Sequence, residues 1–465
     1  MKPKFKRWLR EWVHTRSMAG SQPHRIAWEH WGYQAVSGEM SLHGVPLARL
    51  ADEFGSPLHV LNVPKLMANF SGFARGIDGL TPTVCCSVKT YPVPGMLKLL
   101  LAQGAQAEVI SEHELWLAQR LGVKAEHIIF NGPAKSDAAL EWAIQAGIKT
   151  IHFNHQEEVE RLGAIADRLG KRVRVGFRLT SSGVAGQFGF PVGHPDTVAV
   201  VKRVMEHPWL EPVSLHGHRG FHMHSVDDVL GHVQPMLAFM AQLHQTLGWR
   251  CLMLDVGGSM AVPTVAPLGR RASRMAWTFG VPAGAPDPGA TLGPADYSRL
   301  VCSEVLDFCR THRLDVPELV MEPGRALSAD AQSLISTVLE TRHDTPFDYA
   351  VTDVGTAVAP SACGEYHQMG LASSKADHAP GQERVYRVVG PICHLGDVAT
   401  PAWQFPVLSR GDRLVMMDTG AYFISDASSF SFPQPGVVAV FGDGSVEGLR
   451  RCETSLDMVQ RDTLP

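Results

Sequence analysis

The sequence predicts an α/β protein: a (β/α)8 TIM barrel joined to a second, mostly antiparallel β domain. The first observation is that short, uninterrupted apolar runs alternate with helical segments from about residue 58 to about residue 340; TVCCSV, HIIFN and TIHFN are examples of the runs. Such runs are typical of parallel strands buried on both faces, and about eight strand–helix units predict a barrel. The second observation is a change beyond about residue 340 to alternating, β-branched segments such as RVYRVVGPI and GVVAVF, which predict antiparallel sheet.

These patterns divide the chain. We expect an N-terminal extension over residues 1–38, a β-rich domain from residues 39–58 and 340–465, and the barrel from residues 59–339. Residues 261–298 are rich in Pro, Gly and Ala, and they predict a long loop on the face where a barrel binds its substrate.

The first residues predict a basic amphipathic helix over residues 3–14, with Phe5, Leu9 and Trp12 on one face. Packing of this helix on the protein itself and binding to a surface or a partner both remain open.

Composition excludes several classes of protein. The 465 residues are 45% hydrophobic and 19% charged, with a formal net charge of −4, so no global field recruits nucleic acid or an anionic membrane. No apolar run reaches the length of a membrane span, and the eight cysteines form no CxxC pair. We therefore expect a cytoplasmic enzyme with reduced thiols and with no nucleic-acid or membrane partner.

Three motifs stand at predicted strand ends. Lys89 follows an apolar run in CSVKT, although a lysine alone is more often a surface residue with a buried stem. Gly257 and Gly258 lie in DVGGS, where glycines allow backbone N–H groups to approach a phosphate. Glu322 opens EPGR after the apolar segment ELVM. In a barrel, strand ends are where active-site residues lie.

Four histidines lie within nine residues, in His216-Gly-His218-Arg-Gly-Phe-His222-Met-His224. If residues 220–224 form a strand, His222 and His224 share one face, as two metal ligands would. No acidic or cysteine partner with ligand spacing stands nearby in the sequence, so we expect no metal.

The order of these motifs resembles the barrel-fold decarboxylases that depend on pyridoxal phosphate (PLP), the diaminopimelate/ornithine decarboxylase superfamily, over about residues 45–440. The stretch LLLAQGAQAEVISEHEL after Lys89 and the GAY of residues 420–422 carry the same resemblance. The details are closer to the diaminopimelate decarboxylase branch. The resemblance implies that Lys89 holds PLP as a Schiff base and that Glu322 contacts the pyridine nitrogen. It also implies further cofactor contacts from Arg178, His224, Gly257, Gly258, Gly324, Arg325 and Tyr422.

The segment GPICHLGD in the second domain resembles a family motif that reaches into the partner's active site, which implies a homodimer with shared sites. In the family, the residue matching Cys393 supports protonation after CO2 loss and the residue matching Asp397 contacts the distal end of the substrate. Two expected substrate-binding positions depart from the diaminopimelate pattern: His394 stands in place of a glutamate and Cys363 in place of a tyrosine.

The function that the resemblance implies is PLP-dependent removal of the α-carboxylate of an amino acid, giving an amine and CO2. The substrate would be diaminopimelate-like, or a related amino acid of siderophore, polyamine or natural-product biosynthesis. An amino-acid racemase on the same fold and a non-catalytic PLP-binding homologue remain as alternatives.

Overall fold

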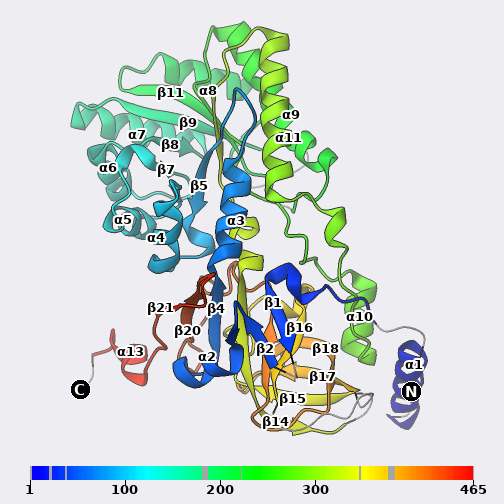
Figure 1. Ribbon diagram of the computed structural model, residues 1–465. Coiled ribbons are helices and arrows are strands. Elements are labelled where there is room, and N and C mark those ends of the chain that lie inside the picture. Colours follow the sequence, from blue (N-terminus) through cyan, green and yellow to red (C-terminus); the bar gives the residue numbers. More distant parts are fainter. Residues whose placement is uncertain are drawn as a thin grey trace. The chain divides into compact units, whose positions relative to one another are not determined.

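The computed structural model describes residues 3–19, 23–36, 39–180, 187–220, 222–344, 347–374 and 383–463. The chain forms two compact units (Figure 1). The barrel unit comprises Met67–Ala261 and Ala290–Leu327, and the β unit comprises Met1–Leu66, Val262–Gly289 and Ser328–Pro465.

Eight parallel strands close into a ring in the barrel unit, which confirms the predicted barrel. The pairing order is β5-β6-β7-β8-β9-β11-β12-β13, and the pairing of β13 with β5 closes the ring. The strands are β5 (Thr83–Ser87), β6 (Gln106–Val109), β7 (Ile128–Phe130), β8 (Thr150–Phe153), β9 (Val173–Thr180), β11 (Leu210–Gly217), β12 (Met253–Asp255) and β13 (Glu318–Met321). A short strand, β10 (Phe190–Pro191), pairs beside β9. Most of these strand residues are buried, because helices cover the outside of the ring and side chains fill its interior.

Helices alternate with these strands and lie outside the ring (Figure 1). They are α3 (Val63–Ala74), α4 (Pro94–Ala102), α5 (Glu112–Arg120), α6 (Asp137–Ala146), α7 (Gln156–Leu169), α8 (Pro195–Met205), α9 (Val226–Leu247), α11 (Pro294–His312) and the short α12 (Arg325–Ser328). Local sequence sets their ends. Ser111, Ser136 and Ser225 accept a backbone N–H at the start of α5, α6 and α9, and Gly147 and Gly170 end α6 and α7 in the left-handed conformation.

The β unit contains two sheets. Strands β1 (Tyr33–Val36), β2 (Glu39–Leu42) and β3 (Val45–Pro46) form a small antiparallel sheet. The larger sheet contains β4 (Leu58–Asn62), β14 (Gln332–Arg342), β15 (Asp348–Thr352), β16 (Met369–Ser373), β17 (Glu383–Val389), β18 (Val398–Pro406), β19 (Arg413–Met416), β20 (Gly436–Val440) and β21 (Val446–Arg450). Its pairings are antiparallel except β4–β20 and β15–β17, which confirms the predicted character of this domain. The helices of this unit are α1 (Pro3–Met18), α2 (Leu47–Phe54), α10 (Arg270–Phe279) and α13 (Ser455–Val459).

Two expectations differ from the structure. Residues 39–58 were assigned to the β domain and the barrel was expected to begin at residue 59, but β4 runs through that boundary and pairs with β14 and β20 in the β unit. All five of its residues are buried, so its pattern is the same as that of a barrel strand. The stretch 261–298 was expected to be a loop, but it contains α10 and the start of α11. The Gly and Pro residues that suggested a loop flank α10, and Gly280 ends it in the left-handed conformation.

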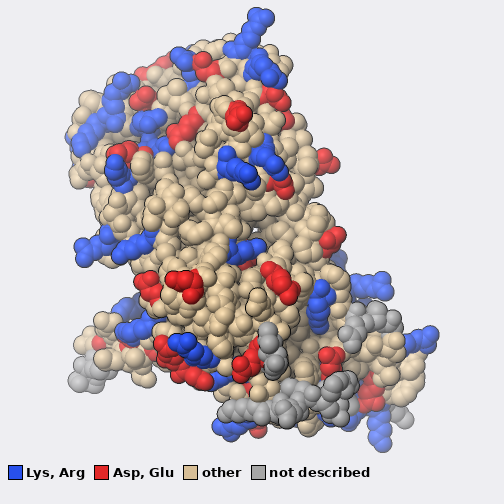
Figure 2. All heavy atoms as spheres, viewed as in Figure 1, with Lys and Arg blue, Asp and Glu red and all other residues tan. Residues whose placement is uncertain are grey.

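Over much of the face shown in Figure 2, Lys and Arg lie among Asp and Glu. Within the described ranges, none of the helices combines the length and the apolar character needed to cross a bilayer.

Candidate active site

A cavity of about 720 Å³ lies within the barrel unit. Its walls come from residues at or just beyond the carboxyl ends of the strands, where barrel enzymes place their active sites. The lining residues that carry charged or polar groups are Lys89, Glu108, Asn131, Arg178, Thr180, Gln187, His216, His218, Arg219 and Glu322. The volume is in the range that holds a cofactor together with a small substrate.

Lys89 lies directly after β5 and forms an ion pair that the sequence did not predict. Its Nζ atom is 2.6 Å from Oε2 of Glu108 and 2.7 Å from Oγ of Ser87. The Lys89 side chain is 28% exposed, whereas that of Glu108 is 1% exposed. The Lys89 amine is therefore reachable from the cavity and is held by a buried carboxylate.

Asn131, at the end of β7, connects that carboxylate to Glu322. Its Nδ2 donates to Oε1 of Glu322 at 2.6 Å and to Oε1 of Glu108 at 3.2 Å. Its Oδ1 is 2.6 Å from Nδ1 of His152, whose Nε2 is 2.7 Å from Oγ of Ser214. Because Oδ1 only accepts, Nδ1 of His152 carries the proton and Nε2 accepts from the serine. Lys89, Glu108, Asn131 and Glu322 therefore form one continuous chain of hydrogen bonds.

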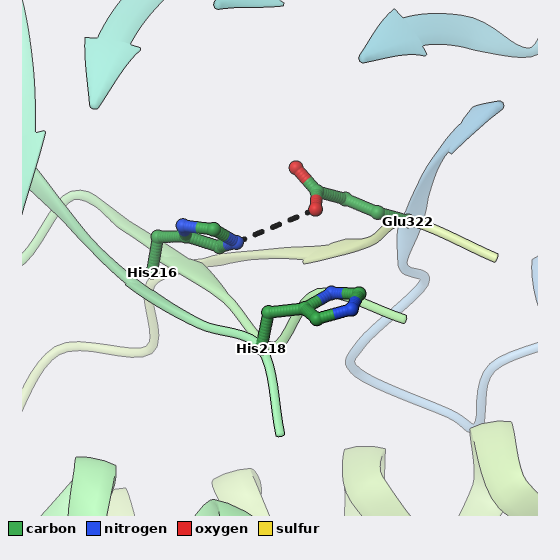
Figure 3. A group of neighbouring side chains, drawn as sticks. All are labelled: His216, His218 and Glu322. Atoms are coloured by element: carbon green, nitrogen blue, oxygen red, sulfur yellow. Dashed lines mark ion pairs between the residues drawn. The ribbon is translucent and has the colours of Figure 1, made fainter. Parts of the chain in front are cut away.

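His216 and His218 face Glu322 across this site (Figure 3). Nε2 of His216 lies 3.4 Å from Oε2 of Glu322, but without hydrogen-bond geometry, and neither ring nitrogen of His216 has a hydrogen-bond partner among the described residues. The His216 ring stacks on His152 with centroids 4.9 Å apart. Burial lowers the pKa of His216 well below its usual range and lowers the pKa of His218 to about 3, so both imidazoles are neutral at pH 7.

The fold supplies the acidic metal partner that the sequence lacked, because ligand atoms of His216, His218 and Glu322 all lie within 4.8 Å of one another. The hydrogen bonds of His218 favour an organic ligand instead. Its Nδ1 accepts the backbone N–H of Gly258 at 3.3 Å, so the neutral ring carries its proton on Nε2 and presents a donor there. A metal would have to displace that proton or break the bond to Gly258.

A second buried carboxyl group, Asp255 at the end of β12, lies beside Glu322. Burial, reinforced by the charge of Glu322, raises the pKa of Asp255 well above its usual range. Its Oδ1 accepts the N–H of Gly257 at 2.9 Å. A protonated Asp255 avoids two adjacent buried negative charges.

The paired glycines lie in the loop after β12. Gly257 has φ +63°, and a side chain on it would strike the carbonyl oxygen of Gly217; a side chain on Gly258 would strike the carbonyl oxygen of Glu322. Ser259, which follows them, also has a positive φ, +73°. Its Oγ accepts the N–H of Gly220 at 3.0 Å, which joins this loop to the loop after β11.

The structure brings His218 to the cavity, and not His224. His224 is absent from the cavity lining, and its Nδ1 lies 3.1 Å from Oγ1 of Thr291. Of the strand considered for residues 220–224, the described residues show an isolated bridge between Met223 and Met260, and residue 221 lies outside the described ranges. The sequence did carry one signal for His218. Residues 216–220 form a His-x-His-x-Gly pattern directly at the end of the buried run VSLHG.

Of the remaining expected residues of the barrel unit, Arg178 lines the cavity, whereas Gly324 and Arg325 do not. Arg178, in β9, lines the cavity with its guanidinium 4.5 Å from the Phe188 ring centroid. Gly324 and Arg325 lie where α12 begins and are not part of the cavity lining. Gly324 packs against the Thr90 side chain, which ties the EPGR segment to the residue that follows Lys89.

The expected residues of the β unit are grouped around the loop 391–397, with two others elsewhere. Cys393 and His394 are exposed on this loop. Asp397 is buried, and its carboxylate accepts N–H groups from Thr356 at 2.7 Å and Ile392 at 2.9 Å. Cys363 is half-buried in a 3-10 turn, and Tyr422, with φ +67°, packs against the cluster of Val262, Val265, Ala329 and Ala421. Asp397 therefore orders the loop rather than facing solvent.

An eight-stranded parallel barrel with a reachable lysine, an oriented carboxylate and neutral imidazoles around one cavity defines a barrel enzyme that works with an organic cofactor. A sequence model described as "Pyridoxal-dependent decarboxylase, pyridoxal binding domain" matches residues 65–329. The chain belongs to this family of pyridoxal-dependent decarboxylases, and it is a PLP-dependent amino-acid decarboxylase.

Similar proteins match over nearly the whole chain. A diaminopimelate decarboxylase of Actinosynnema pretiosum subsp. auranticum is 29% identical over 444 residues, covering 93% of this chain and 94% of the relative. One of Archaeoglobus fulgidus is 24% identical over 451 residues, covering 93% and 99%. The crystal structure of diaminopimelate decarboxylase from M. jannaschii in complex with L-lysine has a TM-score of 0.81 at 22% identity, covering 93% of this chain and 98% of that one.

We predict that Asn131→Ala uncouples the two carboxylates. Losing a hydrogen bond to a charged group costs about 1.5–3 kcal/mol, so we expect kcat/KM and the affinity for PLP each to fall roughly 10- to 100-fold. Absorbance titration of cofactor-free protein with PLP measures the affinity separately from activity. Asn154→Ala is the matched control, because Asn154 is also a buried asparagine after a barrel strand but bonds to Gln187. Equal losses in the two variants would refute the bridging role.

Proposed function

We propose that this enzyme removes the α-carboxylate from an elongated amino acid related to diaminopimelate, with PLP held on Lys89. The observation that carries the proposal is the convergence of Lys89, Glu322, Arg178 and His218 on one cavity. The family assignment supplies the reaction class, and the departures at the expected substrate-binding positions bear on the substrate.

The residues of the cavity fit PLP. The amine of Lys89 is available for the cofactor's aldehyde, and Glu322, oriented by Asn131, presents a carboxylate for the ring nitrogen. His216 has two buried nitrogens with no hydrogen-bond partner among the described residues, which is capacity left for an occupant. We assign the ring-stacking role to His218 in place of His224, and the contact with the ring hydroxyl to Arg178.

When bound, PLP supplies an electron-withdrawing ring that stabilises the charge left on Cα as CO2 departs. Glu322 keeps the ring nitrogen protonated, and Asn131 fixes the carboxylate for that contact. Glu108 and Ser87 orient the amine of Lys89, and the carboxylate of Glu108 accepts its proton when the amine is needed as a nucleophile. Cys393 is assigned the return of a proton to Cα.

We expect Lys89→Ala to abolish covalent capture of PLP. The neighbouring Lys98, on α4, gives a control variant, Lys98→Ala, because Lys98 is an exposed lysine. Borohydride reduction of the PLP-loaded protein followed by peptide mass mapping should place the pyridoxyl group on Lys89, and the Lys89 variant should show no such peptide. A labelled peptide elsewhere in the Lys89 variant would overturn the assignment.

For the cofactor phosphate we propose the barrel residues Gly257, Gly258, Gly324 and Arg325, and we add Arg219; a phosphate contact from Tyr422 rests on the resemblance alone. Arg219 lines the cavity, and both of its neighbours in the chain contact the glycine loop: His218 bonds to Gly258, and Gly220 bonds to Ser259.

Arg219 compensates for a serine that is missing from the proposed phosphate-binding residues. The resemblance places a phosphate-binding serine after His-x-His-x-Gly, where this chain has Phe221, outside the described residues. Ser225 does not replace it, because its hydroxyl caps α9 through Asp228. The ion pair of Arg219 with Asp228, 3.3 Å between Nη2 and Oδ1, ties the guanidinium to the start of α9.

Arg219→Met should therefore lower the affinity for PLP more than the affinity for pyridoxal, which lacks the phosphate. A charge-assisted contact of about 1.5–3 kcal/mol corresponds to roughly a 10- to 100-fold loss. Titration of cofactor-free protein with each compound, monitored by absorbance, gives the two affinities, and Arg299→Met, on the exposed side of α11, serves as the control. If both compounds lose affinity equally, Arg219 does not contact the phosphate.

The substrate proposal depends on two residues expected near the distal end of the substrate that differ from the diaminopimelate decarboxylase pattern. The curated relatives are named diaminopimelate decarboxylases, but His394 and Cys363 replace the glutamate and tyrosine of that pattern. A second ammonium group on the substrate thus loses an anionic partner. We propose a related amino acid with a different distal group, of siderophore, polyamine or natural-product biosynthesis.

We also propose a cytoplasmic homodimer in which the loop 391–397 completes the partner's site. This loop exposes Cys393 and His394, and it also exposes Leu395 entirely, as a segment that is buried by a second copy would. All eight cysteines are unpaired, in keeping with a reducing compartment.

The substrate proposal predicts the outcome of a CO2-release screen. With PLP-loaded protein, we expect faster release from an elongated amino acid with a neutral or acidic distal group than from meso-diaminopimelate or L-lysine. His394→Glu should shift the preference toward diaminopimelate by restoring the anionic partner. Preferential turnover of meso-diaminopimelate by the native enzyme would contradict this substrate class, and loss of optical rotation without CO2 would indicate a racemase.

A further inference from the structure

Helix α1 presents a row of aromatic rings that the decarboxylase site does not use. Phe5, Trp8 and Trp12 are 48%, 55% and 47% exposed. Their spacing of three and four residues places them on one face of the helix. The ring centroids of Phe5 and Trp8 lie 5.7 Å apart, and those of Trp8 and Trp12 lie 6.4 Å apart. The row is therefore a continuous apolar strip.

Helices α1 and α10 themselves carry an excess of positive charge. Helix α1 carries five Lys and Arg residues and one Glu, and α10 carries three Arg residues and no acidic residue. Arg270, Arg271 and Arg274 on α10 are exposed. These two helices hold a net charge of +7, so the rest of a chain with a total of −4 holds −11. The small total conceals this separation, and it was the basis for expecting no membrane partner.

Contacts within the β unit hold the two helices together. Helix α1 contacts α10, and Nδ1 of His14 lies 3.0 Å from the carbonyl oxygen of Phe279. Met18 packs on the cluster formed by Ala276, Val385 and Ala402. The C-terminal half of α1 is thus anchored by one face, and the aromatic row remains exposed.

We propose that α1 and α10 form a surface that binds an anionic lipid bilayer, with Phe5, Trp8 and Trp12 entering the headgroup region. Helices with Lys and Arg around a Trp, Phe and Leu face lie in the membrane interface, and indole rings favour that boundary because they are apolar with one polar edge. Anionic headgroups attract each nearby cation. Nucleic acid or an acidic protein would use the charges but would leave the continuous aromatic strip without a role. At 16 residues, α1 is shorter than a span of about 20 residues, so the attachment is peripheral.

The test is sedimentation of the full-length, PLP-loaded protein with vesicles of phosphatidylcholine alone or of phosphatidylcholine with phosphatidylserine. We expect binding to the phosphatidylserine vesicles, weakened by added salt, with a blue shift of tryptophan fluorescence. The double variant Trp8→Ser/Trp12→Ser should lower the bound fraction by about tenfold or more. Arg270→Gln/Arg271→Gln should lower it several-fold without removing a ring.

Trp116→Ser is the matched control, because Trp116 is 50% exposed on α5 of the barrel unit and lies outside this surface. It should bind vesicles as the native chain does, and all variants should retain native circular dichroism and CO2 release. Absence of vesicle binding, equal binding to both lipid compositions, or an equal loss in Trp116→Ser would overturn the proposal. So would displacement from vesicles by DNA or polyglutamate with no fluorescence shift, which would identify a different partner.

Discussion

Lys89 and Glu108 lie 2.6 Å apart at neighbouring strand ends, and the cost of burying the carboxylate makes this ion pair the constraint on the carboxyl end of the barrel. A buried charge needs a partner and saturated hydrogen bonds. The parallel register of β5 and β6, which sets Ser87 opposite Glu108, brings Lys89 within reach from the next turn. Oε1 of the same carboxylate accepts from Nδ2 of Asn131, and Oδ1 of Asn131 in turn accepts from Nδ1 of His152. One ion pair therefore specifies residues on β5, β6, β7 and β8.

The sequence predicted the members of this site that stand in contiguous motifs. Lys89 and Glu322 end apolar runs, and in a parallel barrel such ends meet at one edge. Asn131, His152 and Ser214 are single polar residues in unrelated stretches, and their contacts span 21 to 191 positions. No local pattern encodes such contacts. His218 was obscured differently: two His-x-His pairs stand six residues apart, and only the strand end at Gly217 distinguishes them.

The fold shows the same division between local and distant information. Repeated strand–helix units predicted the barrel because each unit carries its own periodicity. Strand β4 is as uniformly buried as a barrel strand, so burial alone could not assign it to its sheet; its partners, β14 and β20, lie about 270 and 380 residues further along. Helix α10 was missed because its Gly and Pro flanks dominated the composition of the window, although they are the residues that delimit it.

Charge balance then explains how this cavity accommodates an anionic cofactor. Its histidines are neutral because burial lowers the pKa values of His216 and His218, and burial together with Glu322 raises the pKa of Asp255 well above its usual range. Two carboxylates, Glu108 and Glu322, therefore face two cations, Lys89 and Arg178, while Arg219 is paired with Asp228. A nearly neutral cavity offers no net attraction to a phosphate. On the proposed assignment, affinity for that group comes from directed N–H donors and a guanidinium, so we expect the glycine loop and Arg219 to matter more than the total charge.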